Sequence, residues 1–167
     1  MSVLYLIGMP CYYLGRLVDK CISAFYIRHT KNRLLFCGKN VSFSRRVQFA
    51  HCENIYIGNN TYINGGELVA GKNSKITIGD NCLISYNIHF RTITHKYDKS
   101  DVLIREQGCI ERDIVIGNNV WIGYGTQVLG GVVIGDNSII GAGSIVTKNI
   151  PDNEVWAGVP AKFIKKR

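Results

Sequence analysis

The C-terminal half of the sequence repeats every six residues. Aliphatic residues keep one unbroken phase at Ile116, Ile122, Val128, Ile134, Ile140 and Val146, and glycine follows at Gly117, Gly123, Gly135 and Gly141. Neither an α-helix nor an alternating strand buries one residue in every six, whereas a hexapeptide period is typical of a parallel β-helix. The repeat therefore predicts an all-β solenoid in which each aliphatic residue points inward and stacks on its equivalent in the next coil.

The same period continues upstream with two interruptions. The earlier in-phase residues are Val41, Val47, Ile57, Ile63, Val69, Ile78, Ile84 and Phe90. The phase slips between Val69 and Ile78, which predicts a short loop around residues 72–75. The spacing from Phe90 to Ile116 far exceeds one repeat, so we expect an extruded loop near residues 91–113. Three sides would close a coil of about eighteen residues, with glycine, asparagine or aspartate at corners that need positive φ.

Residues 1–40 lack the hexapeptide phase and form a separate segment ahead of the solenoid domain expected at 41–167. A helix over about residues 12–27 would place Leu14, Leu17, Val18, Cys21, Ile22 and Phe25 on one face. We favour a cap on the open end of the solenoid. The alternative is a helix lying on a membrane surface through Tyr5, Tyr12, Tyr13 and Arg16. The apolar start is too short to span a membrane and lacks the pattern of a signal peptide.

The chain is basic, with a net charge of +8 and a cluster of Lys162, Lys165, Lys166 and Arg167 at its end. Such a balance suits an anionic partner, although ordinary solubilising charge explains it equally well. No nucleic-acid module is recognisable, which favours a phosphorylated coenzyme or an activated sugar. The six cysteines include no CxxC pair, so neither a zinc knuckle nor a redox pair is indicated, and we expect a cytoplasmic protein.

His95 is the best candidate for catalysis among the four histidines. It lies in RTITHKYD, at the start of the expected loop, and functional residues concentrate on loops held by rigid scaffolds. A neutral imidazole can take the proton from a hydroxyl that attacks an acyl carbon. Asp98 would orient this imidazole, or it is a solvated loop acid. Since no cysteine is next to His95 in the sequence, direct transfer is favoured over an acyl-cysteine intermediate.

The coils IGNNVWIGYGTQVLGGVVIGDNSIIGAGSIVTKNIP and the ending VWAGVPAKFIKKR resemble the hexapeptide-repeat acyltransferases, particularly the galactoside, maltose and polysaccharide O-acetyltransferases. The resemblance covers roughly residues 55–167. It implies a left-handed parallel β-helix that assembles as a homotrimer with active sites between subunits. It also implies transfer of an acetyl group from acetyl-CoA, without a metal, to a hydroxyl of a sugar. A surface polysaccharide such as capsule or O-antigen, or its precursor, is the acceptor we expect.

The resemblance also assigns roles to individual residues. His95 takes the position of the general base, and Asn64 that of a substrate-site asparagine. Asp98 is included with the substrate site. The residues implied for the coenzyme are Tyr124, Ala142, Thr147, Lys148, Lys162 and Lys165. Where the family carries an acid, this chain has Lys72 or Asn73, which leaves the acceptor open. We expect Trp121 to cover a trimer seam rather than stack on the coenzyme.

Other functions remain as alternatives. Within acyl transfer, they are N-acetylation of an amino-sugar nucleotide and acetylation of a xenobiotic. A zinc-dependent carbonic anhydrase on the same scaffold needs three converging histidines, whereas His89 and His95 are six residues apart. A non-catalytic assembly module would not need a loop that carries a histidine.

Overall fold

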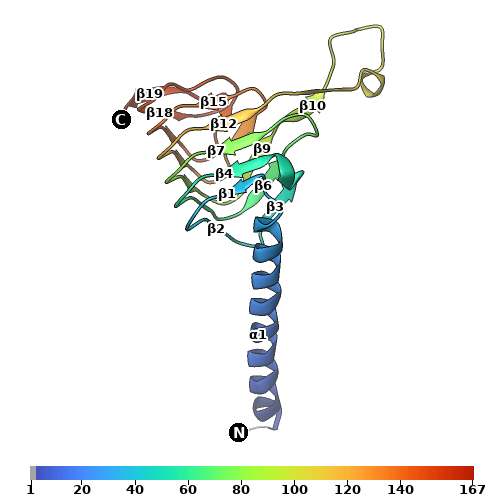
Figure 1. The fold of residues 1–167 in the computed structure, drawn as a ribbon, viewed down its shortest axis with the longest axis vertical. Coiled ribbons are helices and arrows are strands. Elements are labelled where there is room, and N and C mark those ends of the chain that lie inside the picture. Colours follow the sequence, from blue (N-terminus) through green and yellow to red (C-terminus); the bar gives the residue numbers. More distant parts are fainter. Residues whose placement is uncertain (1–2) are drawn as a thin grey trace.

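Three parallel sheets enclose one core in the computed structural model, which describes residues 3–167, with side chains from residue 12 onward (Figure 1). Sheet A contains β1 (Phe36–Cys37), β4 (Ile55–Ile57), β7 (Ile76–Ile78), β12 (Ile114–Ile116) and β15 (Val133–Ile134). Sheet B contains β2 (Ser42–Phe43), β5 (Tyr62–Ile63), β8 (Leu83–Ile84), β13 (Trp121–Ile122), β16 (Ile139–Ile140), β18 (Glu154–Ala157) and β19 (Lys162–Lys166). Sheet C contains β3 (Val47–Ala50), β6 (Gly66–Val69), β9 (Ile88–Arg91), β14 (Gln127–Leu129) and β17 (Ile145–Val146).

From β1 to β17 the chain visits the three sheets in the fixed order A, B, C, so each of these coils adds one strand to every sheet; the last turn adds only β18 and β19, both to sheet B. Neighbouring coils pair in parallel, except that β19 returns antiparallel to β18 at the C-terminal end. β1 already pairs with β4 as part of the first coil. The division of the chain into residues 1–40 and 41–167 stays a prediction.

The six-residue phase identifies the inward side chains. From Ile116 to Val146 every in-phase aliphatic side chain is at most 1% exposed, which confirms the predicted core. Val69 is the exception upstream, because Leu68 points inward and pairs in register with Phe90. The preceding corner is one residue shorter than its equivalent in the next coil, and Gly66 allows this with a φ of 126°. A Cβ at Gly66 would lie 2.2 Å from the carbonyl oxygen of Ile88.

Asparagine makes most of the tight corners. Positive φ angles occur at Asn40, Asn60, Asn81, Asn119, Asn137 and Asn153, as expected for a residue that tolerates this region. Their amides are linked between coils, for example from Asn40 to Asn60 and from Asn60 to Asn81. The glycine after each aliphatic residue has another role: a Cβ at Gly135 would lie 2.1 Å from Oδ1 of Asp152. These glycines permit close stacking of coils. The residue two positions later makes the turn: it is asparagine after Gly117 and Gly135, but glycine after Gly123 and Gly141.

The long connections all leave the coil between sheet C and sheet A. The β3–β4 connection contains the 3-10 helix η1 (Cys52–Asn54), and the β6–β7 connection spans residues 70–75. The β9–β12 connection extends away from the coils (Figure 1) and contains β10 (Ile93–His95), η2 (Ile104–Glu106) and β11 (Cys109–Glu111). β10 and β11 pair as an antiparallel hairpin. Both loops predicted from the interrupted phase are therefore present.

Helix α1 (Val3–Lys31) is longer than the expected segment 12–27 and projects away from the first coil (Figure 1). Its C-terminal half contacts the coil: the Asp19 carboxylate pairs with Arg45 at 2.6 Å, the Tyr26 hydroxyl donates to the Val47 carbonyl at 2.6 Å, and Thr30 is buried. The predicted apolar face, including Leu14, Leu17 and Phe25, is exposed. The helix thus meets the end of the solenoid through its C-terminal half, from Asp19 onward. The side chain of Tyr5 lies outside the described residues. Within the described part of the chain, no helix is both long enough and apolar enough to cross a membrane.

Candidate active site

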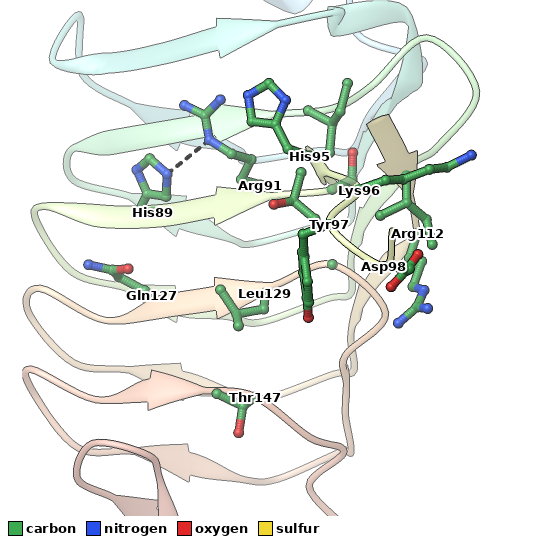
Figure 2. Close-up of a pocket in the computed structure, with 15 residues that line it drawn as sticks. His89, Arg91, His95, Lys96, Tyr97, Asp98, Arg112, Gln127, Leu129 and Thr147 are labelled. Carbon is green, nitrogen blue, oxygen red and sulfur yellow. Dashed lines mark hydrogen bonds between the residues drawn. The ribbon is translucent and has the colours of Figure 1, made fainter. Parts of the chain in front are cut away.

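A groove of about 500 Å³ lies between the outer face of sheet C and the start of the β10–β11 hairpin (Figure 2). Its lining includes His89, Arg91, His95, Asp98, Arg112, Gln127 and Thr147. Strand alternation explains why β9 and β14 contribute to it. Phe90 and Val128 point into the core, so their neighbours point outward, and His89 pairs in register with Gln127.

His95 is exposed at the end of β10, opposite Cys109 of β11. The Cys109 sulfur lies 3.8 Å from Nδ1 of His95. No cysteine is next to His95 in the sequence, but the hairpin brings Cys109 beside it in space, so the sequence spacing alone does not argue against an acyl-cysteine route. The contact occupies one ring nitrogen and leaves Nε2 available for a bound molecule.

Asp98 and Thr147 line the same groove as His95, as a shared site requires. No hydrogen bond joins Asp98 to His95 among the described residues, so an orienting role for Asp98 stays a prediction. Thr147 follows β17 and reaches the groove from a later coil than the histidine (Figure 2).

Sequence reasoning missed the polar cluster of Glu67, His89 and Arg91 on sheet C. Oε2 of Glu67 lies 3.2 Å from Nδ1 of His89 and 3.7 Å from Nη2 of Arg91. Arg91 Nε also donates to His89 Nε2 at 3.2 Å, the dashed line in Figure 2. The signal was present in the sequence, since His89 and Arg91 flank the in-phase Phe90 and strand alternation places both on the outer face.

Three of the expected site residues lie at a different corner, between sheets B and C. Asn64 follows β5, Tyr124 follows β13 and Ala142 follows β16. Tyr124 accepts a hydrogen bond from Asn87, and these two residues help to line a second hollow of about 330 Å³. Within one chain, these residues and His95 lie at opposite ends of the strands of sheet C.

The expected lysines lie near the C-terminal end of the coil. Lys148 places Nζ 5.5 Å from the centroid of the Trp156 ring, whereas Lys162 and Lys165 are exposed on β19. Glu154 accepts hydrogen bonds from Lys166 Nζ at 2.6 Å and from Trp156 Nε1 at 2.7 Å. These bonds, the one from Lys166 first, lower the pKa of the Glu154 carboxyl below its ordinary value.

Sheet B carries an apolar stripe on its outer face. The stripe is formed by four residues that pair in register: Tyr62, Leu83, Trp121 and Ile139. Trp121 is 52% exposed.

Among the described residues, no group of three or more histidine, cysteine, aspartate or glutamate side chains is placed to hold a metal ion.

Comparisons with known proteins agree with this arrangement. Residues 113–148 match the family model described as bacterial transferase hexapeptide (six repeats). The galactoside O-acetyltransferase of Escherichia coli (strain K12) is 44% identical over 130 residues, which cover 77% of this chain and 62% of the relative. The chain thus spans less than two thirds of the length of that curated relative.

Two solved structures share the fold. A galactoside acetyltransferase in complex with coenzyme A has a TM-score of 0.74 at 42% identity, covering 82% of this chain and 67% of that one. A maltose O-acetyltransferase from Clostridium difficile 630 has a TM-score of 0.74 at 35% identity, covering 82% and 72%. With its three-sheeted coil and a six-residue phase that is unbroken from Ile116 to Val146, the chain belongs to the hexapeptide-repeat acyltransferases.

Proposed function

We propose that this protein transfers an acetyl group from acetyl-CoA to a sugar hydroxyl, on a left-handed parallel β-helix. The acceptor we propose is a surface polysaccharide or its precursor. One observation carries the proposal: an exposed imidazole, His95, is held on a paired hairpin at the groove of a chain similar to an acetyltransferase that binds coenzyme A. An acetyl donor and a hydroxyl acceptor are the reactants that such an imidazole serves.

In the proposed mechanism both substrates bind together, so that the transfer becomes effectively intramolecular. Nε2 of His95 removes the acceptor proton while the hydroxyl oxygen attacks the thioester carbonyl carbon. The tetrahedral oxyanion then collapses, the carbon–sulfur bond breaks, and the imidazolium returns its proton to the leaving thiolate. Backbone N–H groups or the Asn64 amide would stabilise the oxyanion. No covalent intermediate on the protein is needed.

We propose a homotrimer because the proposed site residues are divided between two corners of one chain. His95, Asp98 and Thr147 lie at the corner between sheets C and A, whereas Asn64, Tyr124 and Ala142 lie at the corner between sheets B and C. A site shared between two subunits would bring one set from each chain together. The exposed stripe around Trp121 supports such packing, because exposed apolar patches mark interaction surfaces.

The coenzyme is proposed to lie along the later coils. Small residues at the Ala142 corner would let the pantetheine arm approach the backbone, while Lys148, Lys162 and Lys165 would pair with its phosphates. Lysine acts here as a point charge on a flexible stem.

The exposed apolar face of α1 is proposed to contact a membrane surface, where a lipid-linked acceptor would be met. Leu14, Leu17 and Phe25 are exposed, and Arg16 and Lys20 lie on the same helix, as in interfacial helices. Because acetyl-CoA is an intracellular metabolite, the reaction would take place at the cytoplasmic face. Flotation with vesicles rich in anionic lipid tests this contact, and a Leu17→Asp variant should float less.

The central experiment compares His95→Ala with the wild type in an acetyl-CoA-dependent transfer assay. Turnover should fall by about a hundredfold or more, the loss expected for a general base, while the Kd for coenzyme A stays nearly unchanged. His51→Ala is the matched control, since His51 lies at an earlier coil corner and, within residues 12–167, its side chain forms a hydrogen bond or ion pair with Glu53 alone. Near-wild-type turnover of His95→Ala would remove His95 from the mechanism.

A further inference from the structure

We infer that the acceptor carries an anionic group, a carboxylate or a phosphate, which binds Arg91 in the groove beside His95. The inference rests on the proposed acetyl transfer for the identity of the acceptor as a sugar. It concerns the part of the groove lined by β9 and the start of the hairpin, which the proposed coenzyme residues do not occupy. The binding group we assign is the Arg91 guanidinium, supported by Arg112 and Lys96.

The charge of the groove is strongly unbalanced. Arg91, Lys96 and Arg112 line it together with two histidines, and Asp98 is the one carboxylate in that lining. Within residues 12–167, no ion pair involves Lys96 or Arg112, and Arg91 has only the 3.7 Å contact with Glu67. A neutral sugar would leave this positive charge without a partner, whereas a carboxylate or phosphate would neutralise it through charge-assisted hydrogen bonds.

Arg91 is also held in position before any ligand binds. Its Nε donates to His89 Nε2, and the other nitrogen of that imidazole lies 3.2 Å from Glu67. His89 and Glu67 therefore hold the side chain from one side. Glu67 is 3.7 Å from Nη2, beyond hydrogen-bond distance, so among the described residues neither Nη group donates a hydrogen bond and both can meet a bidentate acceptor. Figure 2 shows the side chains of Arg91 and His95 both pointing toward the earlier coils. An anion on Arg91 would thus hold the rest of the acceptor within reach of the imidazole.

The order of strands in sheet C argues against a role for Arg91 in binding the coenzyme phosphates. The strands follow each other as β3, β6, β9, β14 and β17. Glu67 and Arg91 are on β6 and β9, on the early side. Thr147 follows β17, on the late side, and all residues proposed for the coenzyme lie at or beyond residue 124. In this proposal the acceptor binds at the earlier coils, beside Arg91, and the coenzyme binds at the later coils.

Equilibrium binding tests the inference without catalysis. Calorimetry with glucuronic acid, inorganic phosphate and glucose should show that the wild type binds at least one of the anions at least about tenfold more tightly than glucose. Arg91→Gln should remove that preference, as expected when a hydrogen bond to a charged group is lost. Arg105→Gln is the matched control, because Arg105 is exposed on η2 and does not line the groove. A preference for glucuronic acid indicates an acidic sugar, and one for phosphate indicates a phosphorylated acceptor.

Three results would overturn the inference: equal binding of all three probes, an unchanged anion preference in Arg91→Gln, or displacement of the anion by saturating coenzyme A. The last would assign Arg91 to the coenzyme phosphates. The proposed acetyl transfer is tested separately by the His95→Ala assay, so a failure of one experiment does not carry over to the other. In that transfer assay, Arg91→Gln should raise the KM for an acidic acceptor about tenfold and leave the KM for acetyl-CoA unchanged.

Discussion

His95 and Cys109 face each other across the β10–β11 hairpin, with the thiol sulfur 3.8 Å from Nδ1 of the imidazole. The proximity makes an acyl-cysteine route geometrically accessible, and Cys109→Ser separates it from direct transfer. In direct transfer the variant should keep turnover within about threefold of the wild type, since a hydroxyl can replace the thiol as a hydrogen-bonding neighbour. Mass spectrometry of the wild type mixed with acetyl-CoA should show no acetylated Cys109. A turnover loss as large as that of His95→Ala, with a trapped acetyl-thioester, would require the covalent route.

Trp121→Asp should convert the proposed trimer to monomer. The residue lies in the middle of the apolar stripe on sheet B and is 52% exposed in the single chain. An aspartate there would stay solvated in the monomer but would be buried without a partner in the subunit interface, so the substitution should weaken assembly more than folding. Size-exclusion chromatography with light scattering gives the mass directly. Val18→Asp also replaces an exposed apolar side chain by a charged one, but on α1, and this variant should stay trimeric. An unchanged mass for Trp121→Asp would place the subunit interface elsewhere.

Gly66→Ala should destabilise the protein by about 2 kcal/mol or more. Its φ of 126° is unfavourable for a residue with a Cβ, and that Cβ would lie 2.2 Å from the Ile88 carbonyl oxygen. Chemical denaturation monitored by circular dichroism measures the loss. Gly15→Ala on α1 provides the opposite case: its Cβ would meet nothing within 4 Å, and alanine should stabilise the helix by about 0.5–1 kcal/mol. A Gly66→Ala protein as stable as the wild type would contradict the shortened corner.

The ionised Glu154 carboxylate should stabilise the C-terminal end of the fold, and this stabilisation should be lost at acid pH. Hydrogen bonds from Lys166 and Trp156 lower its pKa in the folded state. The carboxylate therefore stabilises the fold above the ordinary value of 4.5, and this contribution is lost as pH falls through the lower folded value. Melting temperatures between pH 7 and about pH 3 should fall less steeply for Glu154→Gln than for the wild type. Glu106→Gln, on the exposed helix η2, should retain the wild-type slope.

The periodic part of the fold could be predicted from the sequence because each coil uses the same short-range sequence pattern. One inward aliphatic residue per side and one asparagine corner per coil are both local signals, so the sequence alone predicts Ile116 to Val146 and the two loops. Val69 was misassigned because the one-residue shortening at Gly66 depends on how the coil stacks on Ile88. Stacking between coils is a contact between residues about twenty positions apart, and no six-residue window contains it.

The site was only partly predictable for the same reason. His95 and Asp98 were identified by their place in a loop, and Thr147 by resemblance, and the structure brings these three to one groove. Cys109 was missed because the hairpin register that places it opposite His95 is not periodic. The Glu67–His89–Arg91 cluster was missed although alternation around Phe90 places two of its members outward, since outward residues of a coil carry no repeat of their own.

The connections that vary in length all lie between sheet C and sheet A. They range from the short segment before β4 to the hairpin that carries His95. Lengthening a surface loop costs little, about 0.6 kcal/mol for each doubling of its length. A lineage of such proteins can therefore gain or lose residues at this one corner while the stacked asparagines hold every coil in register. Acceptor preference can therefore change by insertion at that corner without altering the coils proposed to bind the coenzyme.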